Sequence, residues 1–494
     1  MTHRLSAQTA RAFLWRGIQI WGVKAIFLVR TLVLARLLMP DDFGLLAIAL
    51  VTVEFSTRIT DFGMVQALVQ KKEAQAHHYD VGWTLNVLRG AAVTLAVILA
   101  APWIAELFSE PRAVNLIRVV AFKPLLMGLS SIGLASQQRE LLLRPMARLR
   151  LVESLVNTAI AIGLASTLGV WAMVAGVLGG AVVYLIGSYL VAPHRPRWRI
   201  ETGLAAWLVE FGRWVLIVNI LGMTAGLFLR VAISRQLGTA ALGVYFLASK
   251  LAFLLSDTVS DLLGSVTFPL YSRLQEELHS IRAALQGILL SSTMILAPAS
   301  FLLIAVAPTL TDVVLGEKWS GTGPLVQILT LVGLIGLLGE VIVPALYGLG
   351  KPQRVVVLEV VQSTLVVGLT WWLVGEIGVV GAGVAWLPAI VMSQILGVHF
   401  LRELIDRPFE EVARPLIAVL GICFLGGLCS WLVTLTVSGA GGLVLALAVG
   451  GAVILVLYDV GDRRLDSALS RAVLSVFPQL ASWGYFRRRH HVQV

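Results

Sequence analysis

The sequence predicts an all-α polytopic membrane protein with about fourteen transmembrane helices, and three observations point to this fold class. First, 58% of the 494 residues are apolar and only 13% are charged, with a mean hydropathy of +0.87; a soluble domain carries about 25% charged residues. Second, apolar stretches of about 20 residues, each able to cross a bilayer as a helix, recur along the chain. Third, Lys and Arg are distributed unevenly between alternating loops.

The fourteen predicted spans share this length and are separated by short polar segments. They lie near residues 14–38, 43–69, 80–105, 114–137, 148–169, 171–192, 212–235, 241–265, 283–306, 323–349, 354–376, 379–400, 415–437 and 441–458. The second and eighth are interrupted by charged residues. The first is long and itself contains Lys24 and Arg30, so we expect no cleavable signal peptide.

The loop charges predict the topology. With the N-terminus inside, 25 of the 38 Lys and Arg residues fall in inside segments and 9 lie within spans. Outside loops then hold 4, namely Arg36, Arg112, Arg235 and Lys318. This bias predicts that both termini are cytoplasmic. It also accounts for the net charge of +10 without a nucleic-acid partner. The basic tail FRRRHH (486–491) is either an ordinary cytoplasmic end or a contact with anionic membrane lipids.

The two halves of the chain repeat one pattern. Residues 22–49 align with residues 222–248, and both copies keep the order span, arginine, short loop, glycine, span. The matched pairs, with a slip of one residue after the second, are Gly22 with Gly222, Arg30 with Arg230, Arg36 with Arg235, and Gly44 with Gly243. Six predicted spans separate the copies, which indicates a parallel repeat about an axis along the membrane normal. Chance similarity between apolar segments is the alternative.

Three stretches carry a resemblance to a known family: RLLMPDDFGLLAIA (36–49), ITDFGMVQALVQ (59–70) and WTLNVLRG (83–90). Together they resemble the opening of bacterial polysaccharide flippases. These are the Wzx or colanic-acid-exporter type of the multidrug/oligosaccharidyl-lipid/polysaccharide exporter superfamily. LYGLGKPQRVVVLEV (346–360) is similar to the matching feature late in the second half. The resemblance covers roughly residues 10–400.

The resemblance implies two pseudo-symmetric six-helix lobes around a central cavity, with two additional C-terminal helices. Alternating access would move an undecaprenyl-diphosphate-linked oligosaccharide across the bacterial inner membrane. The expected division is an N-terminal lobe at 1–193, a cytoplasmic linker at 194–211, a C-terminal lobe at 212–402, two further spans at 403–458 and a basic cytoplasmic tail at 459–494. Membrane lipids and other polysaccharide assembly proteins are the expected partners.

Charged residues inside the predicted spans form two stripes. Glu54, Arg58 and Asp61 are spaced i, i+4, i+7 and fall on one face of a helix. The equivalent span carries Lys250, Asp257 and Asp261, spaced i, i+7, i+11. Such stripes do not face lipid. They either form ion pairs that hold each lobe together or line a cavity that handles substrate or ions.

The two lobes differ in the sign of these intramembrane charges. First-lobe spans hold six basic and three acidic residues, a net of +3, and second-lobe spans hold three basic and five acidic residues, a net of −2. Arginine matches phosphate oxygens and stays charged. We therefore expect an anion site for the pyrophosphate, formed by Arg30, Arg58 and Arg89 with support from Lys24.

In the second lobe, Arg230 and Lys250 are further candidates for binding the pyrophosphate or glycan, although both can instead pair with nearby carboxylates. Asp257 and Asp261 could hold a coupling Na⁺ or H⁺, and Glu54 and Asp61 are expected to form cavity ion pairs. No His or Cys spacing suggests a metal site or another cofactor.

Three functions compete. A flippase for lipid-linked oligosaccharide fits the basic first lobe. A cation-coupled antiporter of drugs or small molecules would need an acidic cavity, which the first lobe does not provide. A membrane glycan polymerase or ligase usually needs an extracytoplasmic catalytic loop. The longest outside loop, roughly 307–322, offers only Asp312, Glu317 and Lys318 as ionisable residues. The sequence therefore predicts a transporter that is not an enzyme.

Overall fold

The structure, a computed structural model, describes residues 2–61, 76–140, 142–199, 202–264, 267–274 and 277–464. Within these ranges the regular secondary structure is helical and contains no β-strand. The all-α fold class is therefore confirmed. The chain divides into two compact units, Met1–Leu247 and Ala248–Val494.

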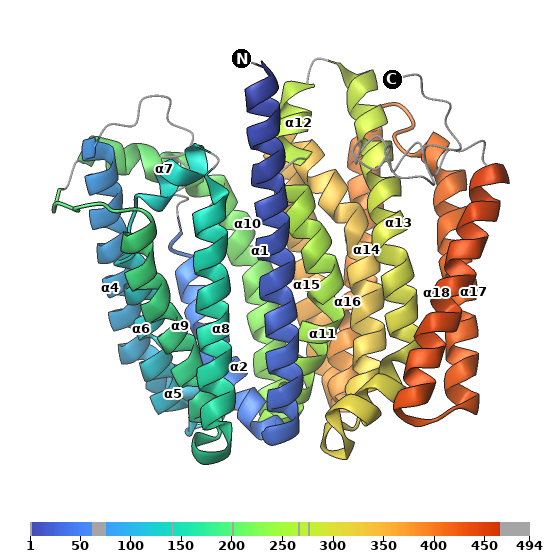
Figure 1. Cartoon of the computed structure of the whole chain (residues 1–494), viewed down its shortest axis with the longest axis horizontal. Helices are drawn as coiled ribbons and strands as arrows, with labels where there is room; N and C mark the ends of the chain where they lie inside the picture. The colour runs from blue at the N-terminus through green and yellow to red at the C-terminus, as the bar shows by residue number, and fades with distance from the viewer. Residues whose placement is uncertain are drawn as a thin grey trace. The chain divides into compact units, whose positions relative to one another are not determined.

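Unit 1 is built from membrane-length helices joined by short turns and three short helices (Figure 1). Its elements are α1 (Thr2–Leu37), α2 (Pro40–Arg58), α4 (Ala76–Leu107), α5 (Ala113–Val120), α6 (Phe122–Gly128), α7 (Leu134–Arg139), α8 (Leu143–Leu168), α9 (Val170–Val191), α10 (Thr202–Leu237) and the first turns of α11 (Thr239–Gly264). Helix α8 packs against α1 and α9, and α4 packs against α5 and α6.

Unit 2 contains the remainder of α11 and the elements that follow it. These are α12 (Thr267–Arg273), α13 (Leu278–Leu310), α14 (Thr322–Gly348), α15 (Pro352–Ile377), α16 (Val379–Arg402), α17 (Glu410–Thr436) and α18 (Gly439–Arg464). A π-helical turn at Thr311–Leu315 and a 3-10 turn at Glu317–Trp319 connect α13 to α14. Helix α13 packs against α14, α17 and α18, and α16 packs against α14 and α15. The hairpin α17–α18 is thus attached to the unit through α13.

Twelve helices of the described ranges are long and apolar enough to cross a membrane, and they coincide with twelve of the fourteen predicted spans. The other two predicted spans differ. Helix α2 has 19 residues and carries four charges; residues 62–75, which would complete the span predicted at 43–69, lie outside the described residues. The span predicted at 114–137 is broken into α5, α6 and α7. The count of about fourteen is therefore not confirmed.

Pro124 explains the break between α5 and α6. It has no N–H group to donate to the carbonyl oxygen of Val120, four residues earlier, so a continuous helix loses a bond there. Helix α5 accordingly ends at Val120. The carbonyl oxygen of the intervening Ala121 instead accepts a hydrogen bond of 2.7 Å from the Thr94 hydroxyl of α4. The interruption is therefore stabilised by the neighbouring helix.

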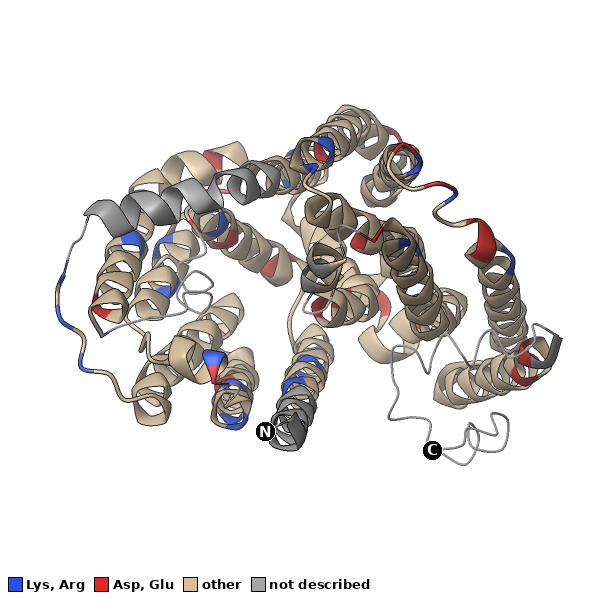
Figure 2. Cartoon of the chain, turned by 90° about the horizontal axis from the view of Figure 1, so that it is seen from above, with Lys and Arg blue, Asp and Glu red and all other residues tan. Residues whose placement is uncertain are grey.

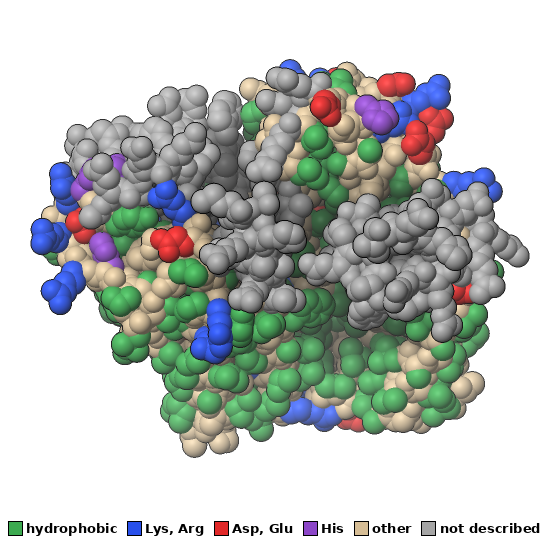
Figure 3. Space-filling model, turned by 45° about the horizontal axis from the view of Figure 1, so that its top comes forward, with side chains coloured by type: hydrophobic (Ala, Val, Ile, Leu, Met, Phe, Trp, Pro, Cys, Tyr) green, Lys and Arg blue, Asp and Glu red, His purple; other side chains and the backbone are tan. Residues whose placement is uncertain are grey.

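Large apolar side chains cover the flanks of the helices. Trp103 is 71% exposed, Leu190 79% and Leu455 71%. On the face shown in Figure 3, hydrophobic side chains cover the sides, and charged and His side chains gather mostly at the rims. Exposure of this extent suits a hydrocarbon environment, in which helices satisfy their own backbone groups. The chain is a multi-pass membrane protein.

Matched glycine turns occur in the two halves. Gly169, at φ 55°, joins α8 to α9, and Gly378, at φ 67°, joins α15 to α16. Their ψ values are −128° and −151°, so both lie in a region of backbone conformation that is open essentially to glycine alone. The order helix, single glycine, helix is therefore the same in both halves, in agreement with the predicted repeat.

A second matched pair of glycines is in direct contact within unit 1. A methyl group added to Gly44 of α2 would overlap the carbonyl oxygen of Thr239, and one added to Gly243 of α11 would overlap that of Pro40. Thr239 stands four residues before Gly243, as Pro40 stands four before Gly44. The contact is therefore reciprocal, as at a two-fold axis.

A charged cluster lies beside this crossing. Arg112, in the loop between α4 and α5, binds the Asp41 carboxylate at 2.8 Å and the Glu110 carboxylate at 2.7 Å, and the Thr239 hydroxyl also bonds to Asp41. Burial opposes ionisation of Asp41, but the hydrogen bonds from Arg112 and Thr239 outweigh it and lower the pKa of Asp41. The hydrogen bond from Arg112 likewise lowers the pKa of Glu110. Both carboxyls are thus held ionised.

The predicted boundaries between lobes stay predictions. The linker at 194–211 is described except for residues 200–201, and side chains are not described between 200 and 219. Most of the predicted basic tail, residues 465–494 including FRRRHH, lies outside the described residues.

Candidate functional site

Arg30 is the best-defined cationic group of the predicted anion site. It lies on α1, which packs along α8. Its guanidinium donates a hydrogen bond of 2.6 Å to the Asn157 side-chain oxygen of α8 and lies 5.0 Å from the centre of the Phe27 ring. One of its nitrogens is therefore held by the protein, and the direction of the guanidinium plane is constrained.

A second charged group lies on α8, the helix that carries Asn157. Arg150 and Glu153 of α8 pair at 2.8 Å, and the Arg150 guanidinium stands 3.9 Å from the centre of the Tyr184 ring on α9. Helix α9 can approach α8 closely because Gly176 and Gly180 face Asn157 and Glu153. Arg150, Glu153 and Asn157 form a polar face on α8, which we call the α8 polar face.

The stripe predicted at residues 54, 58 and 61 is only partly helical. Helix α2 ends at Arg58 and Asp61 lies beyond its C-cap, so the three residues do not share one helical face. The hydroxyls of Thr57 and Thr60 bond back to carbonyls four residues earlier, a pattern that weakens a helix. In this part of the chain the structure records no ion pair between Glu54 and Arg58, and both side chains are exposed.

Asp61 instead pairs with Arg89 of α4 at 3.3 Å. The Arg89 side chain is 23% exposed and the Asp61 side chain 48%. The structure therefore brings together two of the predicted site residues that the sequence had assigned to different roles. Arg30 and Arg89 have different partners, and the convergence of Arg30, Arg58 and Arg89 on one cavity stays a prediction.

The remaining basic candidates have varied surroundings. Lys24 is half-buried on α1, and Lys250 is half-buried on α11. Arg230, the counterpart of Arg30, donates a hydrogen bond of 2.9 Å to the carbonyl oxygen of Gly226 in its own helix. Their assignment to substrate binding also stays a prediction.

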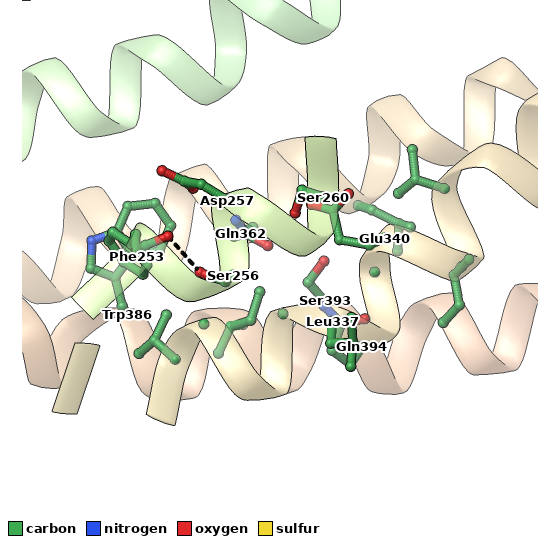
Figure 4. Close-up of a pocket in the computed structure, with 18 of the residues that line it drawn as sticks. Phe253, Ser256, Asp257, Ser260, Leu337, Glu340, Gln362, Trp386, Ser393 and Gln394 are labelled. Atoms are coloured by element: carbon green, nitrogen blue, oxygen red, sulfur yellow. Dashed lines mark hydrogen bonds between the residues drawn. The ribbon is translucent and has the colours of Figure 1, made fainter. Parts of the chain in front are cut away.

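In unit 2, the predicted stripe of α11 lies on one continuous helix, with Asp257 and Asp261 exposed. Asp257 borders a cavity of about 440 Å³ between α11, α14, α15 and α16 (Figure 4). The polar residues that line this acidic cavity are Ser256, Asp257, Ser260, Glu340, Glu359, Gln362, Trp386, Ser393 and Gln394.

Glu340 occupies one wall of the acidic cavity, next to Ser260 in Figure 4. The Ser260 side chain lies beside its carboxyl group, and Asp257 and Asp261 are close enough for their charges to interact with it. No group of three or more His, Cys, Asp or Glu among the described residues could hold a metal ion. The acidic cavity therefore combines carboxyl groups with neutral hydroxyl and amide oxygens.

Several of these residues were not predicted. A signal existed for Glu340 and Glu359, because an ionisable residue within a membrane span indicates function. Asn157, Gln362 and Gln394 gave no such signal, since neutral amides are compatible with any helix surface. Their roles depend on which helix packs beside them.

The chain is similar to several known proteins. It is 26% identical to the succinoglycan biosynthesis transport protein ExoT of Rhizobium meliloti (strain 1021), over 85% of this chain and 86% of that protein. It is 25% identical to the lipopolysaccharide biosynthesis protein WzxC of Escherichia coli (strain K12), over 68% of this chain and 69% of that protein.

The fold is similar to that of the lipid II flippase MurJ in an inward closed conformation. The TM-score is 0.72 at 12% sequence identity, and the similarity covers 92% of this chain and 99% of that one. The sequence model of the family described as polysaccharide biosynthesis protein matches residues 33–324, which is more than half of the chain. The resemblance found in the sequence is confirmed, and the chain belongs to the polysaccharide biosynthesis protein family.

Proposed function

We propose that the protein is a flippase that moves an undecaprenyl-diphosphate-linked oligosaccharide, the repeat unit of a polysaccharide, across the bacterial inner membrane by alternating access. The observation that carries this proposal is Arg30, a cation on a membrane-spanning helix that the Asn157 side chain orients. A pyrophosphate that leaves water needs such a partner, because an uncompensated charge in hydrocarbon is costly. The two relatives named above are polysaccharide biosynthesis proteins, which supports this substrate class.

The pyrophosphate would be bound by Arg30, Arg58 and Arg89, with Lys24 in support. Arg89 is paired with Asp61 in the structure. Binding of the substrate would therefore compete with Asp61 for the Arg89 guanidinium, and release would restore the pair. This exchange lets the site hold a charged head group without holding it permanently.

The test is flipping in proteoliposomes. Purified protein would be reconstituted with a defined undecaprenyl-diphosphate glycan, and glycan reaching the opposite leaflet would be measured. Arg58→Ala should abolish flipping while leaving membrane insertion intact, and Arg58→Lys should restore it only in part, because lysine lacks the bidentate fork. Normal flipping by the double variant Arg30→Ala, Arg58→Ala would contradict the anion site.

We further propose that transport is coupled to a proton or Na⁺ through the acidic cavity of unit 2. A membrane potential of 100 mV supplies about 2.3 kcal/mol per charge moved, enough to bias a conformational equilibrium. Flipping would be compared with and without imposed H⁺ and Na⁺ gradients, in wild type and in Asp257→Asn, Asp261→Asn and Glu340→Gln. Wild-type flipping that is independent of both gradients would rule out the coupling.

The alternative, a cation-coupled drug antiporter, would also use the acidic cavity. It would transport organic cations, and its activity would survive loss of Arg30 and Arg58. The relative ExoT is named as a transport protein, which favours a transporter over a polymerase. The inner-membrane location and the cytoplasmic position of both termini belong to this proposal. A reporter fused after Val494 that is active only in the periplasm would refute the orientation.

A further inference from the structure

The segment that follows α9 forms a basic strap across the start of α4. We use the name basic strap for residues 193–199, Pro-His-Arg-Pro-Arg-Trp-Arg, which have no regular secondary structure. Arg195, Arg197 and Arg199 are all exposed. Figure 2 shows the strap as the thin loop at the left edge, with blue stretches at its arginines.

Backbone hydrogen bonds hold the strap in place. The Arg197 N–H donates to the Asp80 carboxylate at 3.2 Å, and the Arg199 N–H donates to the Thr84 hydroxyl at 3.1 Å. The His194 ring also reaches Asp80, at 3.2 Å. The strap is therefore anchored to the first turns of α4 without using any guanidinium group.

The three guanidinium groups remain available for another ligand. Across the described ranges, no ion pair or hydrogen bond is recorded for the side chains of Arg195, Arg197 or Arg199. Asp80, the acidic residue in contact with the strap, is already occupied by His194 and the Arg197 backbone. An anchored backbone that displays three cations is a preorganised anion-binding surface.

The position of the strap at the ends of two membrane-length helices indicates which class of anion it binds. It begins two residues after α9 ends at Val191 and lies against the start of α4, and both helices are long and apolar enough to cross the membrane. Trp198, between two of the arginines, is 66% exposed and meets the Trp83 ring edge-on at 5.1 Å. Exposed tryptophan at a helix end is typical of the membrane–water interface, where lipid phosphates are concentrated.

We propose that the basic strap is a binding site for the phosphate groups of anionic phospholipids in the adjacent leaflet. Each arginine offers a bidentate contact to phosphate oxygens, and Trp198 lies at the depth of the headgroups. The bound lipids hold the start of α4 and the end of α9 at a fixed level in the leaflet. This site is separate from the transported lipid-linked substrate and does not depend on the proposed function.

The experiment uses the full-length chain purified in detergent and native mass spectrometry to titrate bound lipid. Phosphatidylglycerol should bind wild type at least about tenfold more tightly than phosphatidylcholine, since an interfacial arginine contributes about fivefold in affinity. The triple variant Arg195→Gln, Arg197→Gln, Arg199→Gln should lose this preference. The matched control removes three exposed arginines elsewhere, by Arg402→Gln, Arg407→Gln and Arg414→Gln, and should keep it.

Two further arms decide between the outcomes. The triple Arg→Lys variant of the strap keeps the charge and should retain part of the preference, which also provides a folded comparison if the Gln variant is unstable. Inorganic phosphate should not displace phosphatidylglycerol at equal concentration. Unchanged preference in the Gln variant, equal loss in the control, or displacement by phosphate would each overturn the lipid site.

Discussion

The two copies of the repeat keep the same arginine but give it different neighbours. Arg30 of α1 bonds to the Asn157 side chain of α8, whereas Arg230 of α10 bonds to a carbonyl oxygen of its own helix. Asn157 lies twelve residues before the turn glycine Gly169, and the residue twelve before Gly378 is Val366, which has no hydrogen-bonding side chain. The polar partner is therefore what distinguishes the two copies.

The same alignment extends along the α8 polar face. Counted back from the two turn glycines, Glu153 corresponds to Gln362 and Arg150 to Glu359. Glu359 and Gln362 line the acidic cavity of unit 2. One helix pattern thus carries a basic group in the first half and an acidic one in the second. Equivalent positions on similar helices thus carry opposite charges at Arg150 and Glu359, and an acid and a neutral amide at Glu153 and Gln362.

The largest effect is expected where the two copies are in contact. Gly44→Leu and Gly243→Leu should each lower stability by about 3 kcal/mol or more, because the new side chain overlaps backbone atoms that cannot move aside easily. Thermal unfolding in detergent would measure this. Gly163→Leu, on an exposed part of α8 with open space around it, is the control. A large loss for only one of the two variants would contradict the reciprocal contact.

A second test separates the matched arginines. Arg30→Ala should reduce glycan flipping by about tenfold or more, since hydrogen bonds to charged groups contribute about 1.5–3 kcal/mol. Arg230→Ala should have a clearly smaller effect, because its recorded partner is a carbonyl oxygen of its own helix. Flipping rates of both variants in the same proteoliposome preparation would decide. Equal losses would show that the second copy takes part in binding as fully as the first.

A third, smaller effect is expected from exchanging the partners. Asn157→Val, which introduces the residue found in the second half, should weaken flipping by about threefold to tenfold, less than Arg30→Ala, because the charge stays while its orientation is lost. The reverse exchange, Val366→Asn, should leave flipping nearly unchanged. It tests whether α15 accepts an amide side chain at the position that corresponds to Asn157. Weakened substrate binding with an unchanged unfolding temperature would support an orienting role for Asn157. A lower unfolding temperature alone would indicate a purely structural one.

The smallest effect concerns the charged cluster at the crossing. Because Arg112 lowers the pKa of Glu110 and Asp41, their ionised forms contribute stability above the usual carboxyl pKa values, and this contribution is lost as the pH falls through the lowered ones. Arg112→Gln should cost about 1 kcal/mol or less at pH 7, since Arg112 is largely exposed. It should also reduce the loss of stability between pH 7 and about pH 3. Arg407→Gln, which removes another exposed pair, is the control.

Long apolar runs made most helices predictable from the sequence, because in hydrocarbon a helix is the simplest way to satisfy the backbone. The interruptions were harder to predict. The sequence shows Pro124, but the break at Ala121 is stabilised by Thr94 on another helix. In the same way, the helical spacing of Glu54, Arg58 and Asp61 did not reveal that α2 ends before Asp61.

The site was predictable only where charge marked it. Arg30 and Arg89 stood out because arginine within a membrane span is costly and needs a reason. Their partners did not, because Asn157 is neutral and the Asp61–Arg89 pair depends on how α2 ends beside α4. Pairing across helices is a property of packing, and a single sequence contains it only indirectly.

The contact between Gly44 and Gly243 has a consequence for how the gene could have arisen. A patch that touches its own copy is what a symmetric dimer of a half-length ancestor would present at its axis. In such an ancestor, one mutation at this glycine would have changed both sides of the contact at once. In a single chain the two glycines are separately mutable, yet each is confined by the backbone of the other copy. In such a history, divergence would be free along the helices but blocked at the contact between Gly44 and Gly243.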